Sequence, residues 1–498
     1  MARQFRSDDS SPWVHGFGTQ KDGNLNVSSS ISLPAAQANL NTVSSGQTAI
    51  TISSASSFVN GDFVILAQQI GGSGGAWTGA WELNQIVSGG GTTSLTLAFP
   101  TTHSFETSGV SSGHLHQAWS RAIILEMNQY QNVSISAGGI LNVPTAWNGE
   151  IGGIGGFFAD TFTMTAGSLN AVALGYRQGF SSTAHGDAGG GGGEGWSGRS
   201  GAGGWTGEPV NQNSQSPAGG GKGEATPQTG GASWASYTGG GGGGGSGTFN
   251  NDESAGGGGG GGNLFGGGGG GSGTDGSGGG DVGGLGGLSN AVGGGDGGHP
   301  TNEGANRNGF NSSGSNNHTG RGGLGASGAG RNGGGGGGGA NSPYTNTHLQ
   351  RIFMGGGGGG GGRYAVPGHG DGGDGGRGGG IWFIFARTIN LSGGSISVSG
   401  ANGTAHGSHT RGGAGGGGAG GSILFKCVTG NFGSGLVTAL GGSGGVSIRG
   451  GDGGQGSIGF IHADFATSVS GTTNPGLSTR QDLSLLGPRG GAFLLNML

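Results

Sequence analysis

Aromatic side chains recur between glycine runs in the central part of this chain, where few other side chains could contact a partner. They are Trp196, Trp205, Trp234, Tyr237, Phe249, Phe265, Tyr344, Phe353 and Tyr364. Aromatic residues on rigidly held loops give a large contact area at low entropic cost, which suits binding. We therefore treat these residues as candidate binding residues in loops. The alternative is that they pack over the edges of the glycine-rich structure and shield it.

Patterns that would indicate catalysis, a metal or a cofactor are weak. Lys222 lies in GGGKGE, which lacks the Ser or Thr and the preceding strand of a phosphate-binding loop. Asp371 and Asp374, in GDGGDGG, are a weak match to the paired acids of a polysaccharide depolymerase, and such residues more often sit in turns. The sequence has no HExxH spacing and no GxSxG elbow on a strand–helix turn. We predict no catalytic, cofactor-binding or metal-binding residue, and no enzymatic activity.

The elements that must position the aromatic residues are runs of glycine. Glycine accounts for 142 of the 498 residues, with runs at 189–193, 239–245, 256–262, 266–271, 333–339 and 355–362. Collagen is excluded, because the glycines are clustered instead of falling at every third position, and there are only 12 prolines. An isolated run should be flexible, because fixing the backbone of one residue costs about 1–2 kcal/mol.

Several glycine runs packed side by side could nevertheless be ordered. In polyproline-II-type helices every backbone hydrogen bond must go to a neighbouring segment or to water. Such bonds contribute about 1 kcal/mol net each, and Cα–H···O contacts add about 0.5–1 kcal/mol each. These gains match the entropic cost, so a lattice of several runs can be stable where one run cannot. We predict a polyglycine-II stack, with the inserts forming loops at its ends.

Strand-forming segments flank this glycine-rich region. Val, Ile, Thr and Ser dominate short alternating stretches, which are typical of all-β sandwiches or barrels. The stretches are 24–33, 49–53, 62–67, 94–99, 121–127, 132–136, 381–387, 395–399, 422–428 and 457–463. No helical apolar period of useful length appears. The predicted fold is therefore all-β with a glycine-rich polyproline-II-type stack and essentially no α-helix.

Composition divides the chain into three regions. Residues 1–175 would form a β-sandwich or barrel-like module for attachment or assembly. Residues 176–380 would form the polyglycine-II stack with its variable aromatic loops. Residues 381–498 would form a β-rich segment that continues the stack and ends in the apolar tail AFLLNML.

Charge and apolar content exclude several classes of partner. Charged residues make up 9% of the chain, the net charge is −5, and the 19 Lys and Arg residues are scattered. The sequence therefore lacks the cluster of basic residues that is typical of nucleic-acid binding. The longest apolar run, 381–386, is far shorter than the roughly 20 residues that span a bilayer. The polar start, MARQFRSDDSSPW, is not a secretory signal, and the single cysteine, Cys427, excludes an intramolecular disulfide framework.

The sequence resembles two groups of known proteins, and the first resemblance carries a functional expectation. Residues 186–380, with glycine runs and variable inserts, resemble the tip adhesins of the long tail fibres of T-even-like phages. That resemblance implies packed polyproline-II-type helices whose loops contact a host receptor. GDFVILAQQ (61–69), GGRGGGIWFIFARTINLSGGSISVSGANG (375–403) and GAGGSILFKC (418–427) are similar to glycine-rich proteins of phages and bacterial surfaces.

The expected function is that of a structural and binding protein of a virion surface, such as a tail fibre, spike or other adhesin. Its partners would be a host cell-surface receptor or glycan and other virion subunits, within an oligomer or larger assembly. Its location would be the virion surface or the extracellular space. The alternative is a self-assembling extracellular filament or sheath subunit, favoured by low charge, many β-edges and the apolar tail.

Overall fold

The computed structural model of the chain describes residues 5–6, 17–54, 57–70, 79–108, 120–181, 193–195, 259–262, 351–362, 372–405, 412–447 and 451–486. Within these residues the regular elements are strands and one short 3-10 helix, η1 (Leu483–Leu486), with no α-helix. The all-β prediction is therefore confirmed. The strands are β1 (Phe5–Arg6), β2 (Asn24–Val27), β3 (Ser30–Ser32), β4 (Gln37–Leu40), β5 (Ala49–Thr51), β6 (Phe63–Ile70), β7 (Trp81–Ser88), β8 (Ser94–Leu97), β9 (Arg121–Ile135), β10 (Ile140–Asn142), β11 (Ile154–Met164), β12 (Ser168–Asn170), β13 (Ile381–Leu391), β14 (Ser395–Ser397), β15 (Ser422–Thr438), β16 (Phe460–Asn474) and β17 (Ser478–Gln481).

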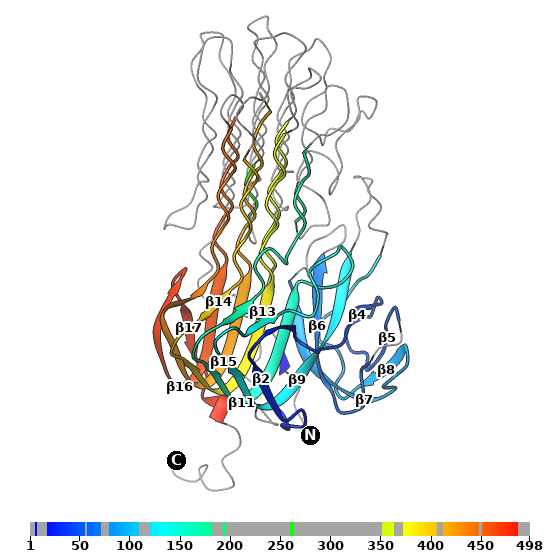
Figure 1. The fold of residues 1–498 in the computed structure, drawn as a ribbon. Coiled ribbons are helices and arrows are strands. Elements are labelled where there is room, and N and C mark those ends of the chain that lie inside the picture. The colour runs from blue at the N-terminus through cyan, green and yellow to red at the C-terminus, as the bar shows by residue number, and fades with distance from the viewer. Residues whose placement is uncertain are drawn as a thin grey trace, which may run out of the picture.

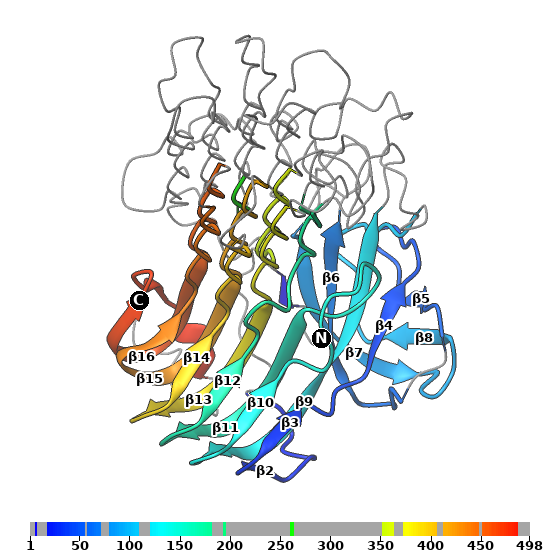
Figure 2. The same ribbon diagram turned by 45° about the horizontal axis from the view of Figure 1, so that its top comes forward.

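Most of these strands form two rows of parallel pairs that run side by side (Figure 2). The first row has the order β2–β9–β11–β13–β15–β16–β17. The second row has the order β3–β10–β12–β14, followed by the end of β15. Each strand of the first row up to β13 passes through a tight turn into its short partner in the second row, so the chain coils repeatedly around one core.

Strand β9 joins this coil to an antiparallel sheet. Its first half, from Arg121 to Met127, pairs antiparallel with β6 and β4. Its second half, from Asn128 to Ile135, pairs in parallel with β11, and its last four residues also pair with β2. The antiparallel sheet continues from β6 to β7, and β5 and β8 form a smaller sheet against the end of β7.

The alternation of side chains along the coil explains its register. Val133, Phe162 and Ile389 occupy matching positions on β9, β11 and β13 and face inward, each 0–1% exposed. Their neighbours along the strands are polar and lie at the surface. Because a shift of one residue would turn the apolar set outward, burial fixes the register of every strand.

Two further apolar clusters pack on the antiparallel sheet. One face meets the parallel coil at the start of β13, where the tilted rings of Trp81 and Phe383 pack at 5.1 Å between centroids. The other face packs against β5 and β8 through Leu66, Ile124 and Phe105, each fully buried. Residues 121–127 of β9 are therefore covered on both sides, which accounts for the nearly continuous apolar run RAIILEM.

Parallel strands need long crossover connections, which are usually helices. Here glycine-rich segments supply them: the chain leaves β14 along 398–405 and returns along 412–421 into β15, and the same happens between β15 and β16 along 439–447 and 451–459. Strands β11 and β13 lie on opposite sides of the region 176–380 in sequence. They nevertheless pair from Ile154↔Ile381 to Met164↔Leu391. The strand segments before and after the glycine-rich region thus share one sheet.

Several strand boundaries differ from the sequence-based prediction. The stretches predicted at 121–127 and 132–136 are one continuous strand, β9, and the single stretch predicted at 24–33 is divided between β2 and β3 by a turn. Strand β11 was not predicted, because Gly155 and Gly156 weaken its β signal. At Gly155 a Cβ would meet the Trp382 ring at 2.5 Å, which favours glycine there.

Phe162 provides a test of the coil. Phe162→Ala removes a fully buried ring that contacts Phe157 edge-on at 5.4 Å, and we expect it to lower the free energy of unfolding by about 3–5 kcal/mol. Chemical denaturation measures this. Thr161→Ala, at the adjacent partly exposed position, should stay within about 0.5 kcal/mol of the wild type; equal losses in both variants would contradict the assigned register.

Candidate functional site

Glycine segments extend from the ends of the strands and run side by side away from the sheets (Figure 1). Their described parts are 171–181, 193–195, 259–262, 353–362, 372–380, 398–405, 412–421, 439–447 and 451–459. We call this set the glycine array. Its backbone N–H groups bond to carbonyls of neighbouring segments at 2.7–3.3 Å, so the array is joined through the backbone.

Segment 412–421 lies at the centre of the array. Its backbone is hydrogen-bonded to six neighbouring segments, which are 259–262, 353–362, 372–380, 398–405, 439–447 and 451–459. Residues 412–421 consist of eight glycines and two alanines, Ala414 and Ala419, and both alanines are fully buried. A segment surrounded in this way has only backbone and methyl groups with which to fill its volume.

Successive residues of this central segment bond to different neighbours in rotation. The N–H groups of Gly415, Gly416 and Gly417 donate to the carbonyls of Thr404, Gly359 and Gly454 respectively, which belong to three different segments. The N–H of Gly418 donates to Ala401, in the same segment as Thr404. The carbonyls of Gly415, Gly416 and Gly417 accept from Gly445, Gly376 and Gly261. The pairing thus repeats every three residues, and each of these residues donates to one neighbour and accepts from another.

The close approach of the segments leaves no room for side chains at many glycine positions. A Cβ on Gly358 would lie 2.2 Å from the carbonyl oxygen of Gly416, and a Cβ on Gly418 would lie 2.1 Å from that of Arg377. Real Cβ atoms do not approach other atoms within 3.0 Å. Glycine is therefore required at these positions by contact between backbones.

An ion pair with a buried carboxylate links the array to the sheets. The carboxylate of Glu194 is fully buried and accepts from Arg177 Nε at 3.1 Å and from Trp147 Nε1 at 2.9 Å. Its backbone carbonyl accepts from Gly357, and Trp147 meets Tyr176 edge-on in the core. Burial lowers the pKa of Arg377, whose guanidinium donates to the carbonyls of Trp147 and Gly175. We did not predict this ion pair from the sequence, although an isolated Glu beside a glycine run indicates a buried acid.

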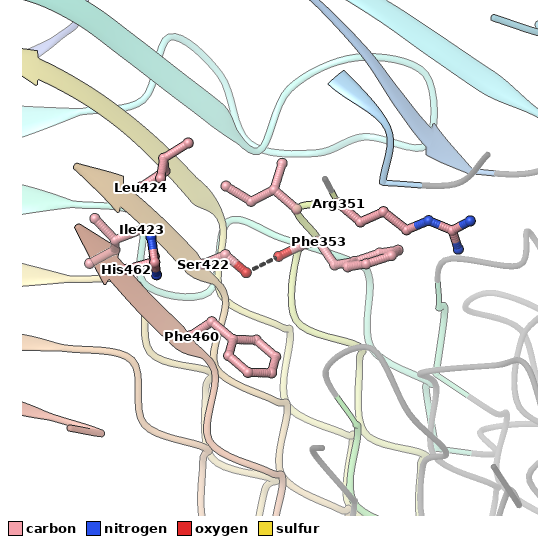
Figure 3. A pocket seen from close by; sticks show the side chains of 8 residues that line it. Arg351, Phe353, Ser422, Ile423, Leu424, Phe460 and His462 are labelled. Atoms are coloured by element: carbon pink, nitrogen blue, oxygen red, sulfur yellow. Dashed lines mark hydrogen bonds between the residues drawn. The ribbon is translucent and has the colours of Figure 1, made fainter. Parts of the chain in front are cut away.

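The position of Phe353 differs from its predicted place in a binding loop. It is 3% exposed and packs in the apolar cluster beneath the array, against Gly79. The hydroxyl of Ser422 donates to its carbonyl at 2.6 Å (Figure 3). The structure therefore places Phe353 in the core, because residues 352–354 form a buried apolar stretch just before their glycine run. The other candidates lie outside the described residues: Trp196, Trp205, Trp234, Tyr237, Phe249, Phe265, Tyr344 and Tyr364.

A small pocket adjoins Phe353. It is lined by Arg351, Ser422, Leu424, Phe460 and His462 among others (Figure 3). Its volume of about 20 Å³ has room for a water molecule and not for a sugar or another substrate. We therefore assign it no binding role.

A cluster of charged residues crosses β15, β16 and β17. Asp464 is fully buried and contacts Lys426 Nζ at 3.2 Å, Arg480 Nε at 2.8 Å and His462 Nε2 at 3.3 Å. Burial alone would raise the pKa of Asp464, but Lys426, His462 and Arg480 outweigh burial and hold the pKa well below its usual range. Burial also raises the pKa of the nearby Cys427 thiol to about 12, so that thiol is unreactive. The cluster fixes the last strand of the coil.

The acids considered for catalysis have structural surroundings where they are described. Asp374 accepts from the backbone N–H of Ser181 at 2.7 Å, and its carbonyl accepts from Thr404, so it joins three segments of the array. Asp371 lies outside the described residues. Across the described part of the chain, no group of three His, Cys, Asp or Glu residues is placed to hold a metal ion. No helix there is long and apolar enough to cross a membrane.

Three comparisons with known proteins gave one match, to a solved structure. No protein-family model matches the chain, and no curated protein matches it by sequence. Among solved structures, the chain matches the tailspike protein gp49 from Pseudomonas phage LKA1 at 16% identity, over 28% of this chain and 23% of that chain, with a TM-score of 0.15. A likeness at this TM-score carries no argument about fold or function.

The longest described glycine run offers a test of the array. Gly358→Ala places a methyl group against the carbonyl of Gly416, and we expect a loss of about 1–3 kcal/mol or more in the free energy of unfolding. The matched control is Gly476→Ala, where a Cβ meets nothing within 4 Å. If both variants unfold at the wild-type denaturant concentration, residues 355–362 are not in close contact with their neighbours.

The Asp464 cluster predicts a dependence of stability on pH. Because the folded-state pKa of Asp464 lies below its unfolded value of about 3.9, the stabilisation is complete above that value. It is lost as the pH falls towards the folded-state pKa. Asp464→Asn should cost roughly 3 kcal/mol at pH 7 and should flatten the decline in stability between about pH 4 and pH 2. Asp160→Asn, which breaks the exposed pair with Arg387, should cost less than about 1 kcal/mol. An unchanged acid profile in Asp464→Asn would contradict the assignment.

Proposed function

We propose that this chain is a structural and binding protein of a virion surface, such as a tail fibre or spike, in which a packed polyglycine-II scaffold presents connecting segments to a host cell or to neighbouring subunits. The observation that carries the proposal is the bonding of segment 412–421 to six neighbours with a repeat of three residues. A three-residue repeat with all hydrogen bonds between segments is what polyproline-II-type geometry requires.

The connectivity supports a role in presentation. Segments 353–362, 398–405 and 439–447 run away from the sheets, and 372–380, 412–421 and 451–459 lead back to them. Each outgoing segment is joined to its returning segment through 363–371, 406–411 or 448–450. These connections differ in length although their flanking segments keep the same bonding pattern. A scaffold with this property can carry different inserts without a change in its own packing.

We propose that the aromatic candidates outside the described residues belong to inserts of this kind, between outgoing and returning segments. Two tryptophans, Trp205 and Trp234, belong to the long stretch between the described segments 193–195 and 259–262. Aromatic anchors of this kind dominate the energetics of protein interfaces. We propose that they contact a host receptor or glycan, within an oligomer or larger assembly at the virion surface or in the extracellular space, and that the chain has no catalytic role of its own.

The test replaces residues 205–218 by a Gly/Ser segment of equal length. We expect binding of the purified protein to host cells to fall, because Trp205 is removed, while the free energy of unfolding stays unchanged. Replacement of 406–411, a short connection without Trp, Tyr or Phe, is the control and should leave binding intact. Full binding after replacement of every aromatic insert would contradict the adhesin role. Long fibres formed by the purified protein alone, seen by electron microscopy, would favour the filament alternative.

A further inference from the structure

The outer face of the parallel coil carries a regular set of uncharged polar side chains. On the outer face of the first row, from β2 to β16, the strands align Asn, Ser and Thr residues in two lines. One line is Asn24, Asn132, Thr161, Thr388, Thr429 and Ser468; the other is Asn26, Ser134, Thr163, Asn390, Asn431 and Ser470. All twelve are exposed or partly exposed. We call these two lines the polar ladder.

The second row carries one further line of polar side chains. Its outward positions align Ser32, Asn142, Asn170, Ser397, Thr438 and Asn474. Inward positions between them, such as Leu141, Leu169 and Ile396, are fully buried. The strands of both rows lie side by side across this part of the molecule (Figure 2). The polar set therefore extends over two adjoining faces of one rigid coil.

Some of these side chains bond to one another along the ladder. Asn132 donates to Asn24 at 2.8 Å, Ser134 donates to Asn26 at 2.6 Å, and Asn170 donates to Asn142 at 2.9 Å. Each such bond fixes a rotamer and uses part of the bonding capacity of the pair. An amide carries two donors and an oxygen with two lone pairs, and a hydroxyl carries one donor and two lone pairs. Donors and acceptors therefore remain, in fixed positions, for a ligand outside the protein.

The chemistry of the ladder excludes most classes of partner. It contains no Lys or Arg to meet phosphates, and the adjacent Arg387 is paired with Asp160, so it does not suit a nucleic acid. It contains no Trp, Tyr, Arg or large apolar residue, which are the usual anchors of protein interfaces. It offers no apolar surface to a lipid bilayer. What it does offer is a neutral array of hydroxyl and amide groups.

The spacing of the array matches a polymer better than a small molecule. Adjacent strands lie about 4.8 Å apart, and alternate residues of one strand lie about 6.6 Å apart. A flat face buries little of a single sugar, so one sugar unit could make few bonds. A chain of sugars laid across the strands presents hydroxyls at a repeat similar to the strand spacing and can bond to several strands at once.

We propose that the polar ladder binds an uncharged polysaccharide whose chain runs across the strands of the coil. This site is separate from the aromatic inserts of the proposed adhesin role, because it lies on the strands and not at the ends of the glycine array. Affinity comes from many weak bonds made together, and it increases with the length of the glycan until the chain spans the strands of the coil.

The experiment uses the full chain and immobilised dextran, mannan and galactan, with hyaluronate as an anionic comparison. We expect retention on at least one neutral polymer and none on hyaluronate. In calorimetry, fragments of increasing length from the retained polymer should bind with increasing affinity, and the free monosaccharide should show no measurable binding. Absence of retention on all three neutral polymers would overturn the proposal and would leave the adhesin role of the inserts untouched.

Variants test whether the polar ladder is the surface that binds the polysaccharide. Thr163→Val and Thr388→Val keep the β-branched shape and remove one hydroxyl each, and we expect affinity to fall about 5-fold for each hydroxyl lost. The matched control is Thr96→Val, a partly exposed strand residue on β8 outside the ladder, which should bind like the wild type. If the double variant fails to fold, Asn390→Asp adds a charge while its carboxylate still accepts from Asn431, and it should weaken binding. Wild-type affinity in a folded ladder variant would overturn the proposal.

Discussion

The structure depends on hydrogen bonds between backbones that have no side chains to hold them apart. In the centre of the glycine array each peptide group donates to one neighbour and accepts from another, and a single Cβ would place a carbon about 2 Å from a carbonyl oxygen. Fixing a glycine costs more conformational entropy than fixing any other residue. One pair of segments would offset little of that cost. Six neighbours around segment 412–421 satisfy its peptide groups on all sides, so the array must form as a set.

The array and the sheets depend on each other. Among the described residues no helix connects the strands of the parallel coil, and the glycine segments act as its crossovers. In return, pairing of β13, β15 and β16 fixes where each returning segment enters the sheet. Glu194 and Arg177 join the two parts at the base of the array, with Trp147 reaching into the apolar core. Without the glycine segments the parallel strands would not be connected. Without the strands the glycine segments would not be aligned with one another.

The sequence predicted strand-forming segments well and their partners poorly. Alternation is a local property, so segments such as IWFIFAR and SILFKC were found directly as parts of β13 and β15. The pairing of β11 with β13 joins residues more than 200 positions apart, and no local pattern encodes it. Phe353 was misinterpreted because a residue next to a glycine run resembles a loop residue, and its burial depends on the sheet beneath. The polar ladder was visible as alternating Asn, Ser and Thr, but only the parallel register shows that these residues form lines.

The direction of the glycine segments gives the array a mechanical property. Outgoing and returning segments lie along one axis, and the hydrogen bonds between them cross that axis (Figure 1). A pull on the far end of the array, with the sheets held in place, loads these bonds in shear. Bonds loaded in shear share the force and must break together, whereas a sideways pull on one segment would open them one after another. The molecule should therefore resist tension along its length far better than peeling from its side.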